Sequence, residues 1–124
     1  IWAPLASGIL TGKYEHGVPK GARMELPDYK WLRERLESAE GRAQVAQTRA
    51  LGTLARELGA SVAQLALAWC LVNKNVSTVI LGATRPEQLR ENLAALELVP
   101  KLDAAVLARI EAIVANKPEA PPRY

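Results

Sequence analysis

The sequence predicts a parallel α/β fold, of which this chain holds only a part. Helical patterns alternate with short apolar segments typical of buried strands, and only two such segments are visible, "IWAPL" and "STVIL", separated by mostly helical sequence. Two parallel strands cannot close a sheet, and a (β/α)8 barrel takes about 250 residues. The 124 residues are therefore expected to be the C-terminal fragment of a TIM barrel, with about two parallel strands and five helices visible.

The first predicted strand begins at Ile1. The opening "IWAPLASG" has no polar lead-in, although a chain terminus is usually exposed and poorly ordered unless something holds it. We therefore expect Ile1 to begin a strand whose neighbours precede it in a longer sequence.

Three helices are predicted before the second strand. Residues 27–38 place Trp31, Leu32 and Leu36 on one side, with Asp28 as acceptor at the start. Residues 41–58 follow with Leu51, Leu54 and Leu58 at helical spacing, and Gly59 is expected to end that helix. The third helix opens at Ser61, since "SVAQ" has the form of a capping box with Gln64, and its expected core side is Val62, Leu65, Ala66 and Trp69.

The second strand and the last two helices complete the expected barrel portion, residues 1–116. "VSTVILG" at 76–82 is rich in β-branched residues and is expected to be buried on both faces. In "TRPEQLRENLAAL" we expect Thr84 as N-cap, Glu87 in the capping box, and three leucines facing inward: Leu89, Leu93 and Leu96. Asp103 is expected to cap the last helix, and residues 117–124 form a Pro-rich extended tail.

Composition excludes several classes of function. The net charge of +3 comes from basic residues interleaved with acidic ones, so no nucleic-acid partner is expected. Cys70 and His16 are the only residues of their types, so neither an internal disulfide nor a structural zinc site can be assembled, and a cytoplasmic location is expected. No apolar run is long enough for a membrane helix, so direct membrane insertion is not expected either.

Two positions leave alternatives open. In "GATRPEQ" the free N–H groups of a helix start, with Arg85 beside them, favour an anion such as phosphate, but an ordinary capped helix accounts for the same residues. Trp2 could stack on a planar ligand, or it could be a core residue, which is the commoner role of tryptophan.

Five stretches in order carry a resemblance: "WAPLASGILTGKY", "YKWLRERL", "LGASVAQLALAWCL", "VSTVILGATRPEQLRENLAAL" and "NKP". Together they resemble the C-terminal part of an aldo-keto reductase, in the branch that contains the β subunits of voltage-gated potassium channels and their bacterial relatives. The resemblance implies a (β/α)8 barrel that binds NADPH and reduces a small aldehyde or ketone.

The resemblance also implies a set of cofactor-binding residues. Trp2 would stack on the nicotinamide, and the pyrophosphate and ribose would be lined by Pro4, Leu5, Ala6, Ser7 and Gly8. Lys13 and Arg23 would come from a loop over the cofactor, with Lys13 on the pyrophosphate and Arg23 at the adenosine end. The adenosine, its ribose and its 2′-phosphate would be held by Gly82, Thr84, Gln88, Glu91 and Asn92. Arg85 departs from the pattern of the branch, and its charge would make it an extra donor to the 2′-phosphate.

The resemblance implies no catalytic residue in this chain, because the family's Tyr, Lys, Asp and His come from the N-terminal half of the barrel. Two functions stay open. One is a part of an NADPH-dependent carbonyl reductase; the other is a non-enzymatic interaction or regulatory module resembling a potassium channel β subunit. Whether the protein forms a homo-oligomer is left open as well.

Overall fold

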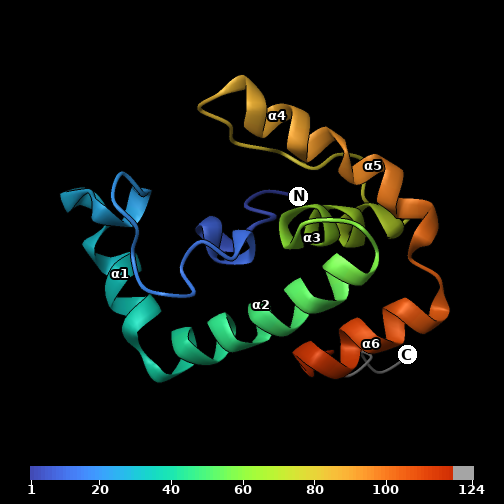
Figure 1. Cartoon of the computed structure of the whole chain (residues 1–124), viewed down its shortest axis with the longest axis horizontal. Coiled ribbons are helices and arrows are strands. Elements are labelled where there is room, and N and C mark those ends of the chain that lie inside the picture. The colour runs from blue at the N-terminus through green and yellow to red at the C-terminus, as the bar shows by residue number, and fades with distance from the viewer. Residues whose placement is uncertain (119–124) are drawn as a thin grey trace, which may run out of the picture.

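The computed structural model describes residues 1–118, and within them the chain is helical (Figure 1). The α-helices are α1 (Lys30–Glu37), α2 (Ala39–Glu57), α3 (Val62–Val72), α4 (Pro86–Leu93), α5 (Ala95–Leu98) and α6 (Ala104–Val114). Short 3-10 segments are η1 (Ala6–Thr11), η2 (Arg23–Glu25), η3 (Pro27–Tyr29) and η4 (Val99–Lys101). Most of the predicted tail, from residue 119 onward, lies outside the described residues.

The predicted α/β class with two parallel strands is wrong for this structure, since residues 1–118 contain no strand. The two apolar segments meet at a single point instead. The amino group of Ile1 donates to the Thr78 carbonyl at 2.8 Å, and the Ile80 N–H donates to the Ile1 carbonyl at 2.9 Å. A strand buried on both faces needs paired neighbours and cover on each face, and one pair of hydrogen bonds provides neither.

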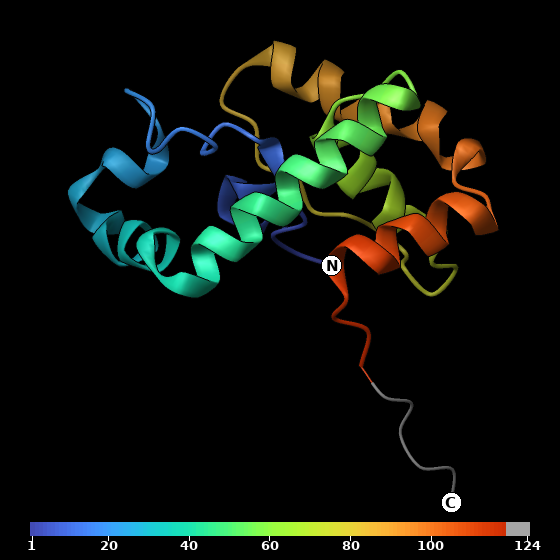
Figure 2. The same cartoon turned by 60° about the horizontal axis from the view of Figure 1, so that its bottom comes forward.

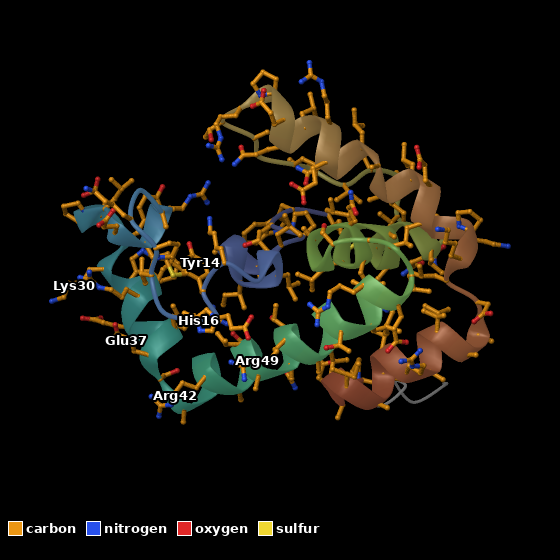
Figure 3. All side chains as sticks on the ribbon, in the orientation of Figure 1. Tyr14, His16, Lys30, Glu37, Arg42 and Arg49 are labelled. Atoms are coloured by element: carbon orange, nitrogen blue, oxygen red, sulfur yellow. The ribbon has the colours of Figure 1, made fainter. Side chains whose placement is uncertain are left out.

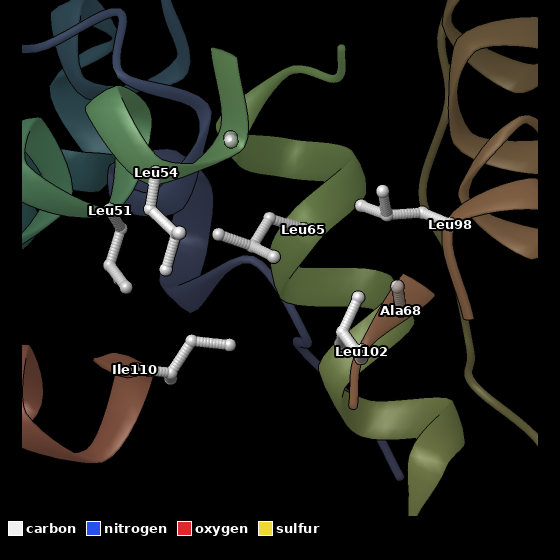
Figure 4. Close-up of a cluster of buried hydrophobic side chains, with 8 residues drawn as sticks. Leu51, Leu54, Leu65, Ala68, Leu98, Leu102 and Ile110 are labelled. Carbon is white, nitrogen blue, oxygen red and sulfur yellow. The ribbon is translucent and has the colours of Figure 1, made fainter. Parts of the chain in front are cut away.

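The larger core lies where α2, α3, α5 and α6 meet (Figure 4). Its buried members are Leu51, Leu54, Ala55, Leu65, Ala68, Leu98, Leu102 and Ile110. The α2 helix contributes leucines at helical spacing, and α3 contributes two of its apolar residues. The segments after α4 contribute Leu98, Leu102 and Ile110. This cluster holds the C-terminal half of the chain together by burying apolar surface.

A second core joins residues of η1, in the middle of the molecule, to residues of η2 and α1, which lie at the end away from α5 and α6 (Figures 1 and 2). Its buried residues are Ile9, Tyr14, Ala22, Met24, Leu32 and Leu36. The long helix α2 reaches both ends, since it carries Leu51 and Leu54 of the larger core and Val45, which packs against this one. The loop that leads from η1 to α1 is therefore held by its own small core.

Several predicted helix boundaries are confirmed. The Gln64 N–H donates to the Ser61 hydroxyl at 3.2 Å, and the Ser61 N–H donates to the Gln64 side-chain oxygen at 2.9 Å, which completes the capping box. Asp103 accepts from the Val106 N–H at 2.9 Å. Gly59, with φ of 75°, follows the end of α2 in the left-handed conformation that favours glycine.

Other boundaries differ from the prediction. Asp28 lies inside η3, so α1 begins only at Lys30, with Tyr29 at the N-cap position. Ser38, expected only as the end of the first helix, caps α2 by accepting from the Gly41 N–H at 3.1 Å. The predicted helix from Thr84 is divided into α4 and α5 at Ala94.

The predicted inward faces of α1, α3 and α4 are partly wrong. Trp31 and Trp69 are exposed large apolar residues, and Ala63, Leu65, Leu67 and Ala68 form the buried side of α3. Leu89, Leu93 and Leu96 are 46%, 52% and 59% exposed. Helical spacing identifies an apolar side, but the neighbours that would cover this side of α4 are absent among the described residues.

Candidate functional site

The loop before and within η1 has an unusual backbone. Ala3, Ala6 and Ser7 have φ angles of 51°, 48° and 56°, and Gly8 follows at 98°. A non-glycine residue in this left-handed region costs on the order of 1–3 kcal/mol, and such residues gather at ligand-binding sites. Pro4 and Leu5 lie inside the same strained turn, which identifies residues 3–8 as a candidate binding loop.

Gly8 lies directly beneath the side chain of Lys13. A Cβ added at Gly8 would meet the Lys13 Cε at 3.2 Å and the Tyr14 Cε2 at 3.3 Å, which is tighter than ordinary contact. The Lys13 ammonium lies 5.1 Å from the centre of the Tyr14 ring, within the range of a cation–π interaction. Glycine at position 8 therefore lets Lys13 lie across the loop.

Lys13 and Arg23 form a small cationic cluster near this loop. Burial, and then the positive charge of Arg23, lower the pKa of Lys13 below that of an ordinary lysine. Arg23 lies over the Tyr29 ring, 5.6 Å from its centre. Neither cation forms an ion pair within residues 1–118. Two cations beside a strained loop, without an acidic partner there, fit an anionic ligand.

Tyr14 is a buried residue between the η1 segment and α1 (Figure 3), and its ring lies beneath the Lys13 ammonium. It is 2% exposed, and its hydroxyl has no hydrogen-bond partner among the described residues. Burial raises the pKa of Tyr14, while the charge of Arg23 and the nearby Met24 backbone oppose that shift more weakly. Tyr14 therefore packs its ring beneath Gly8 and Lys13 while its hydroxyl is buried without a partner among the described residues.

The start of α4 forms the second part of the candidate site. The helix cap lies one residue later in the sequence than predicted. Arg85, not Thr84, holds the N-cap position, and Gln88, not Glu87, is the residue that reaches back. Its side-chain oxygen accepts from the Thr84 N–H at 2.8 Å and from the Arg85 N–H at 3.2 Å. The physical reason is Pro86, which has no N–H and is best tolerated at the first helical position.

The Ile1 hydrogen bonds join the two segments that lead into these two parts of the candidate site. Because Ile1 bonds to both Thr78 and Ile80, the two segments run in the same direction, as in a pair of parallel strands. Trp2 then follows on one segment and Gly82 on the other. The strained loop and the start of α4 therefore leave this contact on the same side of the molecule.

The remaining predicted site residues are open to a ligand. Trp2 is 82% exposed. In this structure it therefore does not have the alternative role of a buried core residue. Gly82 has nothing within 4 Å of where a Cβ would lie. On α4, Glu91 is exposed and Asn92 is half-buried.

Two residues near the site were not predicted as part of it. Tyr14 supports Gly8 and Lys13, and Gln64 donates from its side-chain amide to the Glu91 carbonyl at 3.0 Å. The capping box gave a signal for the local role of Gln64, but a bond across 27 positions has no signature in the sequence.

Comparison with known proteins decides the family. The family model described as "Aldo/keto reductase family" matches residues 1–115. The chain belongs to the aldo/keto reductase family. The resemblance found in the sequence is thereby confirmed.

One relative is similar over most of the chain. A Schizosaccharomyces pombe protein named "Putative voltage-gated potassium channel subunit beta" is 46% identical over 114 residues. The match covers 92% of this chain and 33% of that protein. The chain thus spans about a third of the relative's length. Within residues 1–118, no helix combines the length and the apolar character needed to cross a bilayer.

Proposed function

We propose that this chain forms much of the NADPH-binding site of an oxidoreductase that reduces aldehydes or ketones. Membership of the aldo/keto reductase family supports the reaction class. The observation that carries the cofactor assignment is the cationic pair Lys13 and Arg23 beside the strained loop of residues 3–8. These residues fit the pyrophosphate of a dinucleotide, which needs close backbone approach and positive charge.

At the nicotinamide end, the exposed ring of Trp2 would stack on the planar base. The backbone of residues 4–8 would line the ribose and the pyrophosphate. Lys13 would contribute its ammonium from above Gly8, where its stem already lies. When bound, NADPH supplies the hydride.

At the adenosine end, Thr84 and Arg85 would contact the 2′-phosphate at the start of α4, with Gly82 allowing close approach. The Gln88 oxygen is an acceptor for this loop, so we assign it to shaping the phosphate site rather than to contacting phosphate oxygens. Glu91 and Asn92, one turn further along α4, would contact the adenosine, and Arg23 would approach it from the other side.

A second candidate function is a non-enzymatic interaction module. The observation that favours it is the similarity to a relative named as a potassium channel subunit. We assign none of the residues of this chain a catalytic role, which is compatible with either function. Binding of NADPH alone would not separate the two, whereas reduction of an aldehyde by the full-length protein would establish the enzymatic one.

The test of the cofactor site is a set of dissociation constants for NADPH and NADH, measured by fluorescence titration on the full-length protein. Trp2→Ala should weaken both cofactors by about 1–3 kcal/mol, because stacking on the nicotinamide is common to them. Thr84→Ala and Arg85→Ala should each weaken NADPH about tenfold and leave NADH nearly unchanged, because only NADPH carries the 2′-phosphate.

Thr53→Ala is a suitable control, because Thr53 is an exposed threonine on α2 and lies outside the proposed site. It should change neither dissociation constant. Equal affinity of the unmutated protein for NADPH and NADH would overturn the assignment of the 2′-phosphate to the start of α4.

A further inference from the structure

The Gln64 side chain joins two helices through the two ends of one amide. Its oxygen accepts from the Ser61 N–H at 2.9 Å and completes the cap of α3. Its NH2 group donates to the Glu91 carbonyl at 3.0 Å, on α4. Since Gln64 is half-buried and both groups are in use, the amide is held in one orientation.

The α4 helix has few other attachments. It has no buried residue, and its leucines, Leu89 and Leu93, are about half exposed. The hydrogen bonds at its start join Gln88, in its first turn, only to Thr84 and Arg85, the two residues that precede the helix. Among the described residues, the bond from Gln64 is the one side-chain hydrogen bond that ties α4 to another helix. The far end is anchored separately, because Ala95 and Leu98 of α5 are buried.

We propose that Gln64 is a positioning residue for the adenosine end of the cofactor site. It would fix the position of α4 relative to α3 and the rotation of α4 about its own axis. In this way it would place Glu91, Asn92 and the helix start that faces the 2′-phosphate. This inference rests on the proposed function, since it assumes that α4 holds the adenosine.

Gln64→Glu separates the two roles of the amide. A glutamate keeps an oxygen to accept from the Ser61 N–H and is a preferred residue at this capping-box position. A carboxylate cannot donate to the Glu91 carbonyl, and two acceptor oxygens would then face each other. The variant should therefore retain the start of α3 and release α4.

Gln47→Glu provides a matched control. The Gln47 NH2 group also donates to a main-chain carbonyl across helices, that of Val114, at 3.1 Å. That contact joins α2 to the end of α6 and lies outside the proposed cofactor site. The control removes the same kind of hydrogen bond, so it reports what such a loss does to stability alone.

The experiment titrates the full-length protein and both variants with NADPH and with adenosine 2′,5′-bisphosphate, and follows thermal unfolding in parallel. Gln64→Glu should weaken both ligands by about two- to tenfold, as expected for one lost hydrogen bond. Gln47→Glu should leave both dissociation constants unchanged, while the two variants shift the unfolding temperature by similar amounts.

The outcomes separate the two proposals. If the unmutated protein binds NADPH and Gln64→Glu binds both ligands as tightly as Gln47→Glu does, the positioning role is overturned and the proposed function stands. If the unmutated protein binds neither ligand, the proposed function fails and the positioning role fails with it. Weakening of NADPH without weakening of adenosine 2′,5′-bisphosphate also contradicts the inference, because the effect would then lie at the nicotinamide end.

Discussion

Lys13 is the residue whose chemistry the proposed site depends on most. Its stem lies across Gly8 and its ammonium lies over the Tyr14 ring. Burial and the neighbouring charge of Arg23 lower the pKa of Lys13. In the absence of a ligand, the ammonium therefore loses its proton at a lower pH than an ordinary lysine does.

This shift predicts how NADPH affinity depends on pH. The protonated ammonium attracts the pyrophosphate, and a bound anion raises the pKa of Lys13 again. Affinity should therefore fall as pH rises above the pKa of Lys13 in the free protein, and the fall should begin at a lower pH than it would for an unperturbed lysine. Titrations with NADPH from neutral to alkaline pH test this expectation.

Lys13→Arg is the control for the pH dependence, because arginine keeps its charge throughout that range. Its affinity should stay level where that of the unmutated protein declines. If both proteins show the same alkaline decline, the titrating group is not Lys13.

The sequence predicted residues well where their roles are local. Ser61, Gln64 and Asp103 cap helices as expected, because a cap depends on neighbours within four positions. It failed by one residue at Thr84, where Pro86 takes the first helical position. It gave no sign of Tyr14 as a support for Lys13, because that contact depends on how the loop folds over Gly8.

At the scale of elements, two glycines associated with α2 should respond oppositely to the same substitution. Gly59 has φ of 75°, a conformation that an alanine adopts only with strain, and there is open space around it. Gly52 lies inside the helix, where an added Cβ would meet the Arg56 side chain at 3.6 Å, an ordinary contact.

Gly59→Ala should therefore lower the free energy of unfolding by about 1–2 kcal/mol, and Gly52→Ala should raise it by about 0.5–1 kcal/mol. Urea denaturation of the two variants beside the unmutated protein measures both changes. A stabilising Gly59→Ala would mean that α2 does not end in the left-handed turn.

The strands were the element that sequence reasoning got wrong, and the cause is physical. The pattern of residues 76–82 describes a segment suited to burial between neighbours, but a strand forms only where a neighbour supplies hydrogen bonds. Here Ile1 supplies them at one position. The same limit applies to α4, whose leucine side was identified correctly as apolar but remains exposed. A sequence pattern indicates which side of a segment is apolar. Whether that side is buried depends on whether other elements pack against it.

At the scale of the whole molecule, two separate cores position the two parts of the site. The small core of Ile9, Tyr14, Met24, Leu32 and Leu36 supports the loop with Lys13 and Arg23. The larger core supports α3 and α5, and through them α4. The Ile1 hydrogen bonds join the segments that lead into the two parts, and the cofactor would span both parts, so binding should order residues from both at once.

Hydrogen–deuterium exchange of the full-length protein, with and without NADPH, shows whether one cofactor site is shared by the two parts. We expect amides in residues 2–23 and in residues 82–92 to become protected together, over the same range of NADPH concentration. The solvent-facing side of α6 should exchange as before. Protection of only one segment, or of neither at NADPH concentrations that saturate the protein, would contradict a single cofactor site shared by the two.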